Sequence, residues 1–446
     1  MSISRRDLLA LSALGVASAS LEAATPSPSK GSSYPSIDFD AQLPKKKATR
    51  VVVVGGGWSG LSIAKNIRAY SPQAEVILVE QRSHFMSCPV SNLWLVDEVS
   101  LEYLTHDYFQ AARSYGYTYF QATAIDVDKA KQILYTSNGK IAYDYLVLSP
   151  GIEYDYSKWT SDPVLEQRLR REYPAGFIPG SEHITLKNKL KNFKGGNFIL
   201  TVPSGNYRCL PAPYERACII AAYFRQKKIK GKVILFDANP DITIKAAGFH
   251  SAFKEIHKEY IEYVPSAAIT GIDLDAKVIS TEFDEYEFAD AALYPPVRGA
   301  SILEKMGLAR DAKNKQEAYI DELTYEAKGA KNIFIAGDAR PMGFSKSGNT
   351  ANTEGQYVAS IVATHINNTP QLKWEPPTTL CFSVVDTKPS KAIYVLTQYS
   401  YDHASETFDF AGTVYDEDWH HTGAKNAASI IDWADSLYAD MFGDSH

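Results

Sequence analysis

The feature that most constrains the fold is a buried strand that runs directly into a glycine trio. Residues 50–54 (RVVVV) are a nearly continuous run of β-branched residues, typical of a strand buried in a parallel sheet. Gly55, Gly57 and Gly60 follow in the spacing G-x-G-x-x-G, and residues 61–70 then show a helical pattern. In such a motif the first glycine permits a tight turn and the second lets the backbone approach a pyrophosphate. The third lets the helix pack closely on the strand.

A second strand and an acidic residue complete this motif. Residues 75–79 are predicted to form the strand, which ends at Glu80, about twenty residues beyond the glycines. An acidic residue at this spacing accepts hydrogen bonds from ribose hydroxyls, and Trp58 within the glycine turn is assigned to the same site. Strand, glycines, helix, strand and acid in this order predict a Rossmann-like dinucleotide-binding domain of the α/β class.

Two later segments indicate which dinucleotide is bound. Residues 331–338 (KNIFIAGD) resemble the second flavin signature of flavoproteins with two dinucleotide-binding domains, in which the aspartate, here Asp338, binds the ribityl chain of FAD. Residues 146–151 (LVLSPG), which end in Gly151, resemble the motif that closes the first half of the same domain. A hairpin is predicted at residues 137–140. These signatures favour FAD over NAD and predict an FAD domain that is split by an insertion.

The insertion, at about residues 160–300, has the pattern of a second Rossmann-like unit without its ligand. Residues 197–202 and 232–236 are predicted strands, with a helix from about 214 to 226 between them. The loop after the first strand, residues 203–213, contains one glycine and three prolines instead of a second glycine trio. It leaves little room for a pyrophosphate against the backbone. The sequence therefore predicts a retained fold and a lost nicotinamide site.

Composition excludes several classes of function. The chain has 46 Lys and Arg against 52 Asp and Glu, a net charge of −6, and no basic block, which argues against nucleic-acid binding. No apolar run reaches the ~18–20 residues of a transmembrane segment. The cysteines form no C-x-x-C or C-x-x-C-H, so we expect no metal site and no haem in this chain. The pair His420-His421 lacks further ligands at metal spacing and is expected at the surface.

The N-terminus has the pattern of an export signal. Arg5-Arg6 precedes a weakly apolar stretch at residues 8–21, and small residues that suit cleavage follow. This resembles a twin-arginine signal, which exports folded proteins that carry cofactors. We therefore expect residues 1–24 to be a signal, residues 25–47 to be a linker, and the mature protein to be periplasmic, where a disulfide persists.

Four further segments resemble one family specifically. Cys88 lies in SCPVSN, Cys209 in RCLPAPYERA and Cys381 in TLCFS, while SKSGNTAN follows the Gly-Asp strand. Together with the flavin signatures, these segments resemble the flavoprotein subunit of flavocytochrome c sulfide dehydrogenase over nearly the whole mature chain. The glycine trio is shared with many flavoproteins, whereas the cysteine–proline loop with its distant partner cysteine is more specific. Leu210 and Ala212 stand where the family's loop has a further proline and a glycine.

The resemblance implies a role for each of these residues. Cys88 occupies the position at which the family attaches FAD covalently, with a free or merely adjacent cysteine as the alternative. Cys209 and Cys381 occupy the two positions of the family's redox disulfide beside the flavin ring, and Glu215 that of an acidic residue close to it. The segment after about residue 371 resembles the interface domain that covers the flavin and helps to dock a c-type cytochrome subunit.

The chemistry of these residue types supports the resemblance. A hydrosulfide anion can attack a disulfide to give a persulfide and a thiolate, and FAD can accept an electron pair and release single electrons. Glu215 is predicted to manage a proton at the cysteine pair, with a carboxylate that suits the helix dipole as the alternative. Lys346 is predicted to stabilise negative charge on the reduced flavin, with a solvated surface lysine as the alternative. Cys218 is expected to be a buried core residue.

The sequence thus predicts a periplasmic FAD-dependent sulfide dehydrogenase subunit that forms sulfane sulfur or polysulfide and passes electrons to a c-type cytochrome in a heterodimer. One alternative is a sulfide:quinone oxidoreductase. Such an enzyme needs an amphipathic C-terminus that binds the membrane, and the acidic segment 430–446 suits an anionic membrane surface badly. The other is a non-catalytic accessory flavoprotein of a sulfur-oxidising complex. A type II NADH dehydrogenase would need the missing second glycine trio.

Three domains are expected after the signal and the linker. The FAD-binding domain comprises residues 48–159 and 301–370, and the second Rossmann-like domain comprises residues 160–300. A C-terminal α+β interface domain comprises residues 371–446. Its acidic end is expected to be a solvated helix face, with steering of a basic cytochrome as the alternative.

Overall fold

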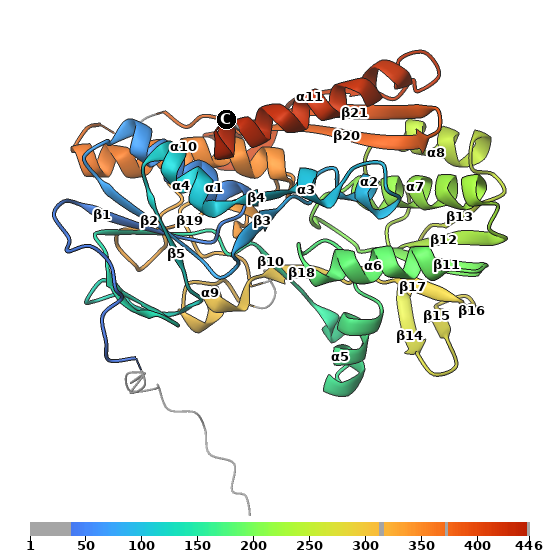
Figure 1. Cartoon of the computed structure of the whole chain (residues 1–446), viewed down its shortest axis with the longest axis horizontal. Helices are drawn as coiled ribbons and strands as arrows, with labels where there is room; N and C mark the ends of the chain where they lie inside the picture. The colour runs from blue at the N-terminus through green and yellow to red at the C-terminus, as the bar shows by residue number, and fades with distance from the viewer. Residues whose placement is uncertain (1–36, 312–315, 371–372, 444–446) are drawn as a thin grey trace, which may run out of the picture. The chain divides into compact units, whose positions relative to one another are not determined.

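Strand β1 (Arg50–Val54) lies at the centre of a parallel sheet, as its β-branched sequence predicts (Figure 1). The register places Val52 opposite Ile77 on one side and Leu146 on the other, and all three side chains are buried. In sheet order, the five strands are β19 (Ile333–Ile335), β9 (Tyr145–Leu148), β1, β2 (Glu75–Glu80) and β5 (Thr118–Gln121).

The computed structural model describes residues 37–311, 316–370 and 373–443. The predicted export signal lies outside these residues. Residues 39–446 belong to one compact unit, so the last residues assigned to the linker pack on the folded part of the chain. Ala41 N–H donates to the carbonyl of Lys140 (2.9 Å), and Lys47 N–H donates to the Glu75 carboxylate (2.8 Å).

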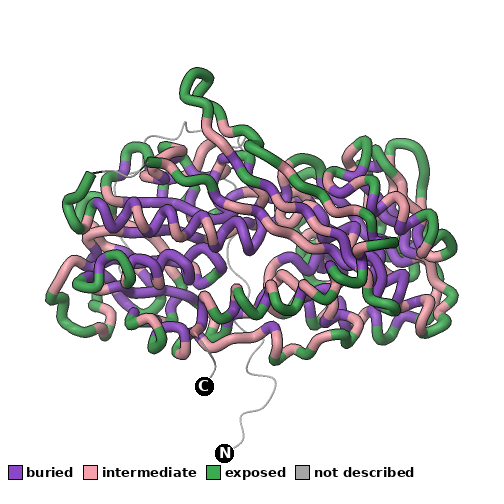
Figure 2. Tube along the Cα trace, turned by 90° about the horizontal axis from the view of Figure 1, so that it is seen from above, coloured by how far each residue is buried: buried purple, intermediate pink, exposed green. Residues whose placement is uncertain are grey.

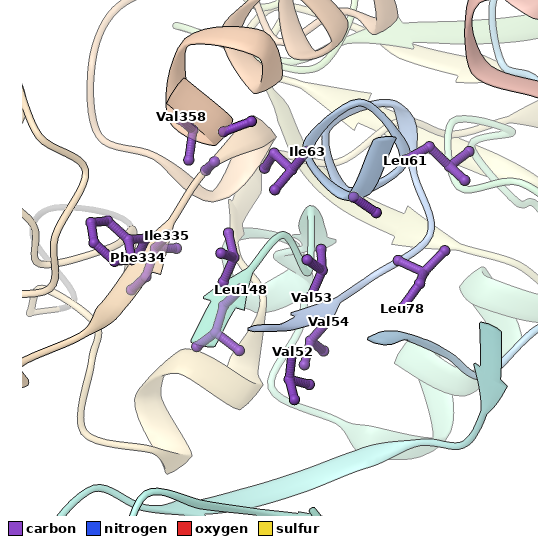
Figure 3. Packing of buried hydrophobic residues seen from close by; sticks show 14 of the residues in the cluster. Val52, Val53, Val54, Leu61, Ile63, Leu78, Leu148, Phe334, Ile335 and Val358 are labelled. Carbon is purple, nitrogen blue, oxygen red and sulfur yellow. The ribbon is translucent and has the colours of Figure 1, made fainter. Parts of the chain in front are cut away.

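Two helices cover one face of the parallel sheet. α1 (Trp58–Tyr70) begins at the glycine turn, and α10 (Gly348–Asn367) lies against it. Ser62 Oγ donates to the carbonyl of Asn352 (2.7 Å), which joins the two helices. In Figure 3, Ile63 of α1 and Val358 of α10 point toward the buried strand residues. The dinucleotide turn is therefore backed by a tightly packed core.

The inserted segment folds around a second parallel sheet, as predicted. Its strands, in the order β13-β12-β11-β17, are β13 (Ile261–Val264), β12 (Gly231–Asp237), β11 (Gly196–Val202) and β17 (Asp290–Ala292). The helices of this segment are α5 (Pro163–Glu172), α6 (Ser181–Asn192), α7 (Ala212–Lys227) and α8 (Ala246–Glu255). A small antiparallel sheet contains β14 (Ile269–Asp273), β15 (Val278–Thr281) and β16 (Glu285–Glu287).

An antiparallel strand pair marks the two crossings of the chain between these sheets. β10 (Ile152–Tyr154) leaves the first sheet, and β18 (Val297–Gly299) returns from the second. They pair in the register Ile152 to Gly299 and Tyr154 to Val297. This arrangement is that of a domain interrupted by an insertion.

The C-terminal residues form an antiparallel sheet and a long helix. The elements are β20 (Thr378–Thr387), β21 (Ser390–Asp402), β22 (Thr407–Asp416) and α11 (Gly423–Phe442). Figure 1 shows this layer along the top of the molecule, where β20 contacts α7 and α10 and α11 contacts α1 and α4. The layer therefore bridges the two parallel sheets.

Shorter elements fill the connections, and the buried residues concentrate in the interior of the unit (Figure 2). The remaining strands are β3 (His84–Met86), β4 (Thr105–Asp107), β6 (Ala124–Asp128), β7 (Ile133–Thr136) and β8 (Gly139–Ala142). The remaining helices are α2 (Ser91–Leu95), α3 (Leu101–Leu104), α4 (Tyr108–Tyr115) and α9 (Ser301–Lys305). The β7–β8 turn confirms the predicted hairpin, and the α/β class is confirmed. Over the described ranges, no helix is long and apolar enough to cross a membrane.

The close packing of α1 on β1 gives a stability prediction. A Cβ atom on Gly60 would lie 1.8 Å from the carbonyl oxygen of Gly55, whereas one on Gly57 would have no atom within 4 Å. We expect Gly60→Ala to lower the free energy of unfolding by about 1–3 kcal/mol, because the helix must move away from the strand. Gly57→Ala is the matched control and should leave the free energy of unfolding nearly unchanged. Urea denaturation of the wild type and the two variants measures these free energies. Equal midpoints for all three proteins would contradict the close packing of α1 on β1.

A buried histidine on α6 makes the fold sensitive to acid. His183 is fully buried and its Nε2 lies 3.2 Å from Ser91 Oγ; burial lowers its pKa to about 3 from 6.5. The unfolded chain therefore takes up this proton first, so stability is complete above pH ~6.5 and falls as the pH decreases toward ~3. We expect His183 to contribute a loss of about 1.4 kcal/mol per pH unit in this window. Denaturation experiments between pH 7 and 4.5 give the free energy of unfolding as a function of pH. His183→Gln should make this dependence shallower than in the wild type, and His421→Gln, at an exposed control position, should leave it unchanged.

Candidate active site

The glycine turn opens into a cavity of about 360 Å³. β1, the turn and β2 supply its first wall, and the segment after β9 and the loop after β3 supply others. Most residues predicted to bind the cofactor line this cavity, namely Gly55, Gly57, Trp58, Glu80, Cys88 and Gly151. Gly60 lies behind them, where it allows α1 to approach β1.

Several observations fit this cavity to FAD. The first residues of α1 receive no side-chain cap, and the space where Gly57 would carry a Cβ is open, so backbone N–H groups can receive a pyrophosphate. Glu80 accepts from Gly56 N–H (2.7 Å) and lines the cavity at the position of a ribose ligand. Asp338 is 7% exposed, and its Oδ1 has no hydrogen-bond partner within the described structure. A ribityl hydroxyl would satisfy that buried oxygen.

Cys88 connects this cavity to a second one. It lies in the loop between β3 and α2, and its Sγ is 3.5 Å from the carbonyl of Phe177. Burial raises the pKa of the Cys88 thiol, and the nearby guanidinium groups of Arg208 and Arg82 partly oppose this. Cys88 and Arg208 line both cavities. A cofactor held by the glycine turn would therefore extend past Cys88 toward the second cavity.

The second cavity, of about 60 Å³, brings together the other predicted catalytic residues. Cys209, Glu215 and Cys381 all line it, although they come from a loop, from α7 and from β20. Each of the two thiols shifts the pKa of the other, which places Cys209 and Cys381 side by side in this cavity. The two cysteines are 172 positions apart in the sequence, and only the folded chain places them in contact.

The position of Cys209 depends on the loop between β11 and α7. Its φ of +59° is in the left-handed region, which is unusual for a residue with a side chain. Cys209 N–H donates to the carbonyl of Lys346 (2.8 Å), and Arg208 Nε lies 3.2 Å from Asp338 Oδ2. Tyr294 OH donates to the Arg208 carbonyl (2.9 Å). The contacts with Lys346 and Asp338 hold the loop against the FAD-binding part of the chain, and the one with Tyr294 holds it to the inserted segment.

The two thiols of the pair differ in acidity. The pKa of Cys381 is lowered, first by its hydrogen bond with Cys209 and then by the nearby Lys245 ammonium, although burial opposes this. The pKa of Cys209 is raised well above the usual value by the same hydrogen bond and by burial.

Glu215 is a buried carboxyl group beside this pair. It lies in the first turn of α7, a helix that begins with Ala212-Pro213. Val384 N–H donates to its Oε1 (2.8 Å), and Asn92 Nδ2 donates to its Oε2 (2.7 Å). Burial raises the pKa of Glu215. The carboxyl group lies in the first turn of α7 and also lines the cysteine cavity. Its position therefore fits both predicted roles, a carboxylate that suits the helix dipole and a proton carrier at the cysteine pair.

Lys346 is buried, which contradicts one of the two roles predicted for it. It is 1% exposed, so the solvated surface lysine is wrong. Its Nζ donates to the Asp338 carbonyl (2.7 Å) and lies 3.1 Å from Glu317 Oε1, and burial lowers its pKa. The charge is thus balanced by Glu317, and the side chain supports the Gly-Asp turn. Its action on a reduced flavin stays a prediction.

The structure also places Cys218 and the pair His420-His421. Cys218 is fully buried on α7, which confirms it as a core residue. His420 and His421 are exposed as expected, with side chains 49% and 83% accessible. In the parts of the chain that the structure describes, no three His, Cys, Asp or Glu residues are grouped to hold a metal ion.

The structure adds three residues to the site. Arg208 and Asn92 lie inside the segments that carry the family resemblance, and their polar side chains next to the cysteines were a signal that could have been used. Lys245, whose Nζ donates to the Cys381 carbonyl (3.0 Å), precedes α8 in a stretch with no recognisable motif. Nothing in the sequence indicated that it lies beside Cys381.

Comparisons with known proteins agree with this site. Three family models match the chain. Residues 184–295 match the central part of the sulfide dehydrogenase [flavocytochrome c] flavoprotein chain, and residues 375–442 match the flavocytochrome c sulphide dehydrogenase flavin-binding family. Residues 49–160 match the pyridine nucleotide-disulphide oxidoreductase family. The chain therefore carries an FAD-binding domain.

Individual relatives point the same way. The sulfide dehydrogenase [flavocytochrome c] flavoprotein chain of Chlorobaculum thiosulfatiphilum is 54% identical over 43 residues, 10% of this chain and 90% of that sequence. The mitochondrial sulfide:quinone oxidoreductase of Mus musculus is 24% identical over 68% of each chain. The structure of the sulfide:quinone oxidoreductase of Aquifex aeolicus has the same fold, with a TM-score of 0.70 at 17% identity over 89% of this chain and 92% of that one. This chain belongs to the family of flavocytochrome c sulfide dehydrogenase flavoprotein chains and is a flavin-dependent sulfide oxidoreductase.

Proposed function

We propose that this chain is the flavoprotein subunit of a periplasmic sulfide dehydrogenase. In this proposal Cys209 and Cys381 form a redox disulfide, sulfide leaves as sulfane sulfur or polysulfide, and a c-type cytochrome takes the electrons. The observation that carries the proposal is the contact of the two thiols in a cavity that shares Cys88 and Arg208 with the dinucleotide cavity. The cysteine pair therefore lies next to the proposed flavin site.

The chemistry at the cysteine pair is balanced without further reactants. Hydrosulfide attacks one sulfur of the disulfide, so the Cys209–Cys381 bond breaks and a new sulfur–sulfur bond forms. The products are one cysteine persulfide and one thiolate, and the charge of the anion passes to the thiolate. Bound FAD would supply the two-electron acceptor for the reduced pair and the one-electron donor for a haem.

Glu215 would manage the proton of this reaction. Its carboxyl group lines the cavity and its raised pKa, caused by burial, favours the protonated form more than in an exposed glutamate. A carboxyl group in this state can accept a proton from an incoming hydrogen sulfide and donate one to the cysteine persulfide that forms. Val384 N–H and Asn92 hold its two oxygens in place for either role.

Cys88 would anchor the flavin covalently. It is placed between the two cavities, where the isoalloxazine end of a cofactor bound to the glycine turn would pass. A covalent bond prevents the loss of a cofactor that could not be replaced after export. Export itself is proposed from Arg5-Arg6 and the apolar stretch that follows, which lie outside the described residues.

The C-terminal layer supports a protein acceptor. The apolar face of α11 is buried, with Ile430, Ala434 and Met441 packed inward, while Asp432 and Asp435 face solvent. Such a surface favours a basic protein over an anionic membrane. A sulfide:quinone oxidoreductase remains the second candidate, because proteins of that name are among the relatives.

An anaerobic titration with sulfide tests the disulfide. We expect about one equivalent of sulfide to bleach the flavin absorbance band of the purified holoprotein, because the disulfide is a two-electron mediator. Cys209→Ala and Cys381→Ala should each abolish this bleaching. Cys218→Ala, which removes a core thiol away from the cavity, should retain it. A wild-type protein with full flavin that sulfide does not bleach would contradict the proposal and favour an accessory flavoprotein. Reoxidation by cytochrome c or by a soluble quinone then separates the two acceptors.

A second experiment tests the flavin anchor. In the wild type, acid precipitation should leave the flavin with the polypeptide, and its fluorescence should follow the protein band on a denaturing gel. Cys88→Ser should release the flavin into the supernatant, since a hydroxyl group does not form the thioether. Free flavin in the wild-type supernatant would show that Cys88 is merely adjacent to the cofactor.

A further inference from the structure

A buried ammonium group lies directly behind one half of the cysteine pair. Lys245 precedes α8, is 1% exposed, and has a left-handed φ of +55°. Its Nζ donates to the carbonyl of Cys381 (3.0 Å) and to Ser383 Oγ (2.6 Å), both on β20. The ring of Phe249 covers it, with its centroid 5.9 Å away. Lys245 thus crosses from the second Rossmann-like unit to the C-terminal sheet.

This ammonium differs from the other buried lysines in having no carboxylate partner. Among the buried lysines, Lys346 is paired with Glu317 and Lys187 with Asp97; the partly buried Lys189 is paired with Asp290. Within residues 37–311, 316–370 and 373–443, no carboxylate oxygen lies within the 4 Å of an ion pair with Lys245. A cation taken out of water without a nearby anion is costly.

The groups that face Lys245 show where its counter-charge can arise. Burial lowers its pKa, and the titratable groups that oppose this are Cys381, then Glu215 of α7, Cys209 and Glu417, which follows β22. Glu215 and Glu417 each accept a backbone N–H, from Val384 and Gly248. A disulfide carries no charge, so the thiolate that appears when the cysteine pair is reduced adds an anion beside Lys245.

We propose that Lys245 is a positioning residue that stabilises Cys381 as the leaving thiolate, and that hydrosulfide therefore attacks Cys209. The inference rests on the proposed redox disulfide and adds its direction. Hydrosulfide sulfur bonds to Cys209 Sγ, the Cys209–Cys381 bond breaks, and its electron pair stays on Cys381. The products are a persulfide on Cys209 and a thiolate on Cys381.

The acidities of the two thiols agree with this direction. The pKa of Cys381 is lowered while that of Cys209 is raised; the Lys245 ammonium lowers the pKa of both thiols, and its Nζ contacts the main chain of Cys381. In thiol–disulfide exchange the sulfur with the lower thiol pKa leaves faster. Lys245 would then keep its proton as long as the thiolate persists, because each charge compensates the burial of the other.

Alkylation of the reduced pair tests the role of Lys245 without using turnover. Holoenzyme reduced with dithiothreitol and freed of it anaerobically is treated with limiting iodoacetamide between pH 5 and 10, and each cysteine peptide is quantified. We expect Cys381 to react at lower pH than Cys209. Lys245→Met should raise the pH of half-maximal Cys381 alkylation by about one to three units, since a nearby buried cation is lost. Lys245→Arg should restore most of the wild-type profile.

Two further variants separate this effect from a loss of folding. Lys189→Met removes a partly buried ammonium on α6, which is paired with Asp290, and should leave the profile of Cys381 unchanged. Ser383→Ala removes one anchor of Lys245 and should shift the profile in the same direction as Lys245→Met, but by less. Flavin content and the denaturation midpoint identify unfolded variants. The inference is overturned if folded Lys245→Met and Ser383→Ala keep the wild-type profile, or if Cys209 is the more reactive thiol.

The site of attack has its own readout. Wild-type enzyme is mixed anaerobically with one equivalent of sulfide and quenched within milliseconds by alkylation at acidic pH. The protein is then digested, and the masses of the cysteine peptides are measured. An added sulfur on the Cys209 peptide supports the inference, and one on the Cys381 peptide overturns it. Sulfur on neither peptide argues against the disulfide mechanism itself. The alkylation profiles still report whether Lys245 acts on Cys381, so the two failures are distinguishable.

Discussion

The site depends on the contact between the loop before α7 and the segment that leads into α10. Cys209 N–H donates to the Lys346 carbonyl, and Asn206 Nδ2 donates to the carbonyl of Phe344 (3.2 Å). The ion pair of Arg208 with Asp338 reinforces both. In a nicotinamide enzyme the corresponding loop would receive a pyrophosphate; here it binds the neighbouring domain. The same contact holds Cys209 in a backbone conformation that a non-glycine residue seldom adopts alone.

Buried charges are arranged in two different ways around this contact. Arg340 and Glu354, both fully buried, form a close pair at 2.6 Å, and Lys346 has its own carboxylate partner. Such pairs offset the desolvation of each member and give a rigid frame. Glu215 and Lys245 instead have only neutral hydrogen-bond partners and flank the cysteines. Their charges are therefore free to respond when the thiols change their protonation or redox state.

The local motifs were predictable because each needs only neighbouring residues. The strand, turn and helix around Gly55 to Gly60 and the hairpin at residues 137–140 follow from periodicity and turn chemistry. The lost nicotinamide turn was visible as prolines in a single loop. Lys346 was harder, because the sequence shows a lysine in a polar loop and does not show the Glu317 carboxylate that allows it to be buried.

The sequence by itself determined the fold class and the dinucleotide motif, since these depend on residue type and short spacing, and it singled out three of the four cysteines as candidates for the site. Only the tertiary structure decided that Cys209 lies beside Cys381, that Cys88 lines two adjoining cavities, and that Lys245 lies behind the pair. The physical reason is that these contacts join segments that are far apart in the sequence. They are the loop before α7, the residue before α8 and the strand β20. The energies of these contacts depend on burial and distance, which the fold sets and which no local pattern records.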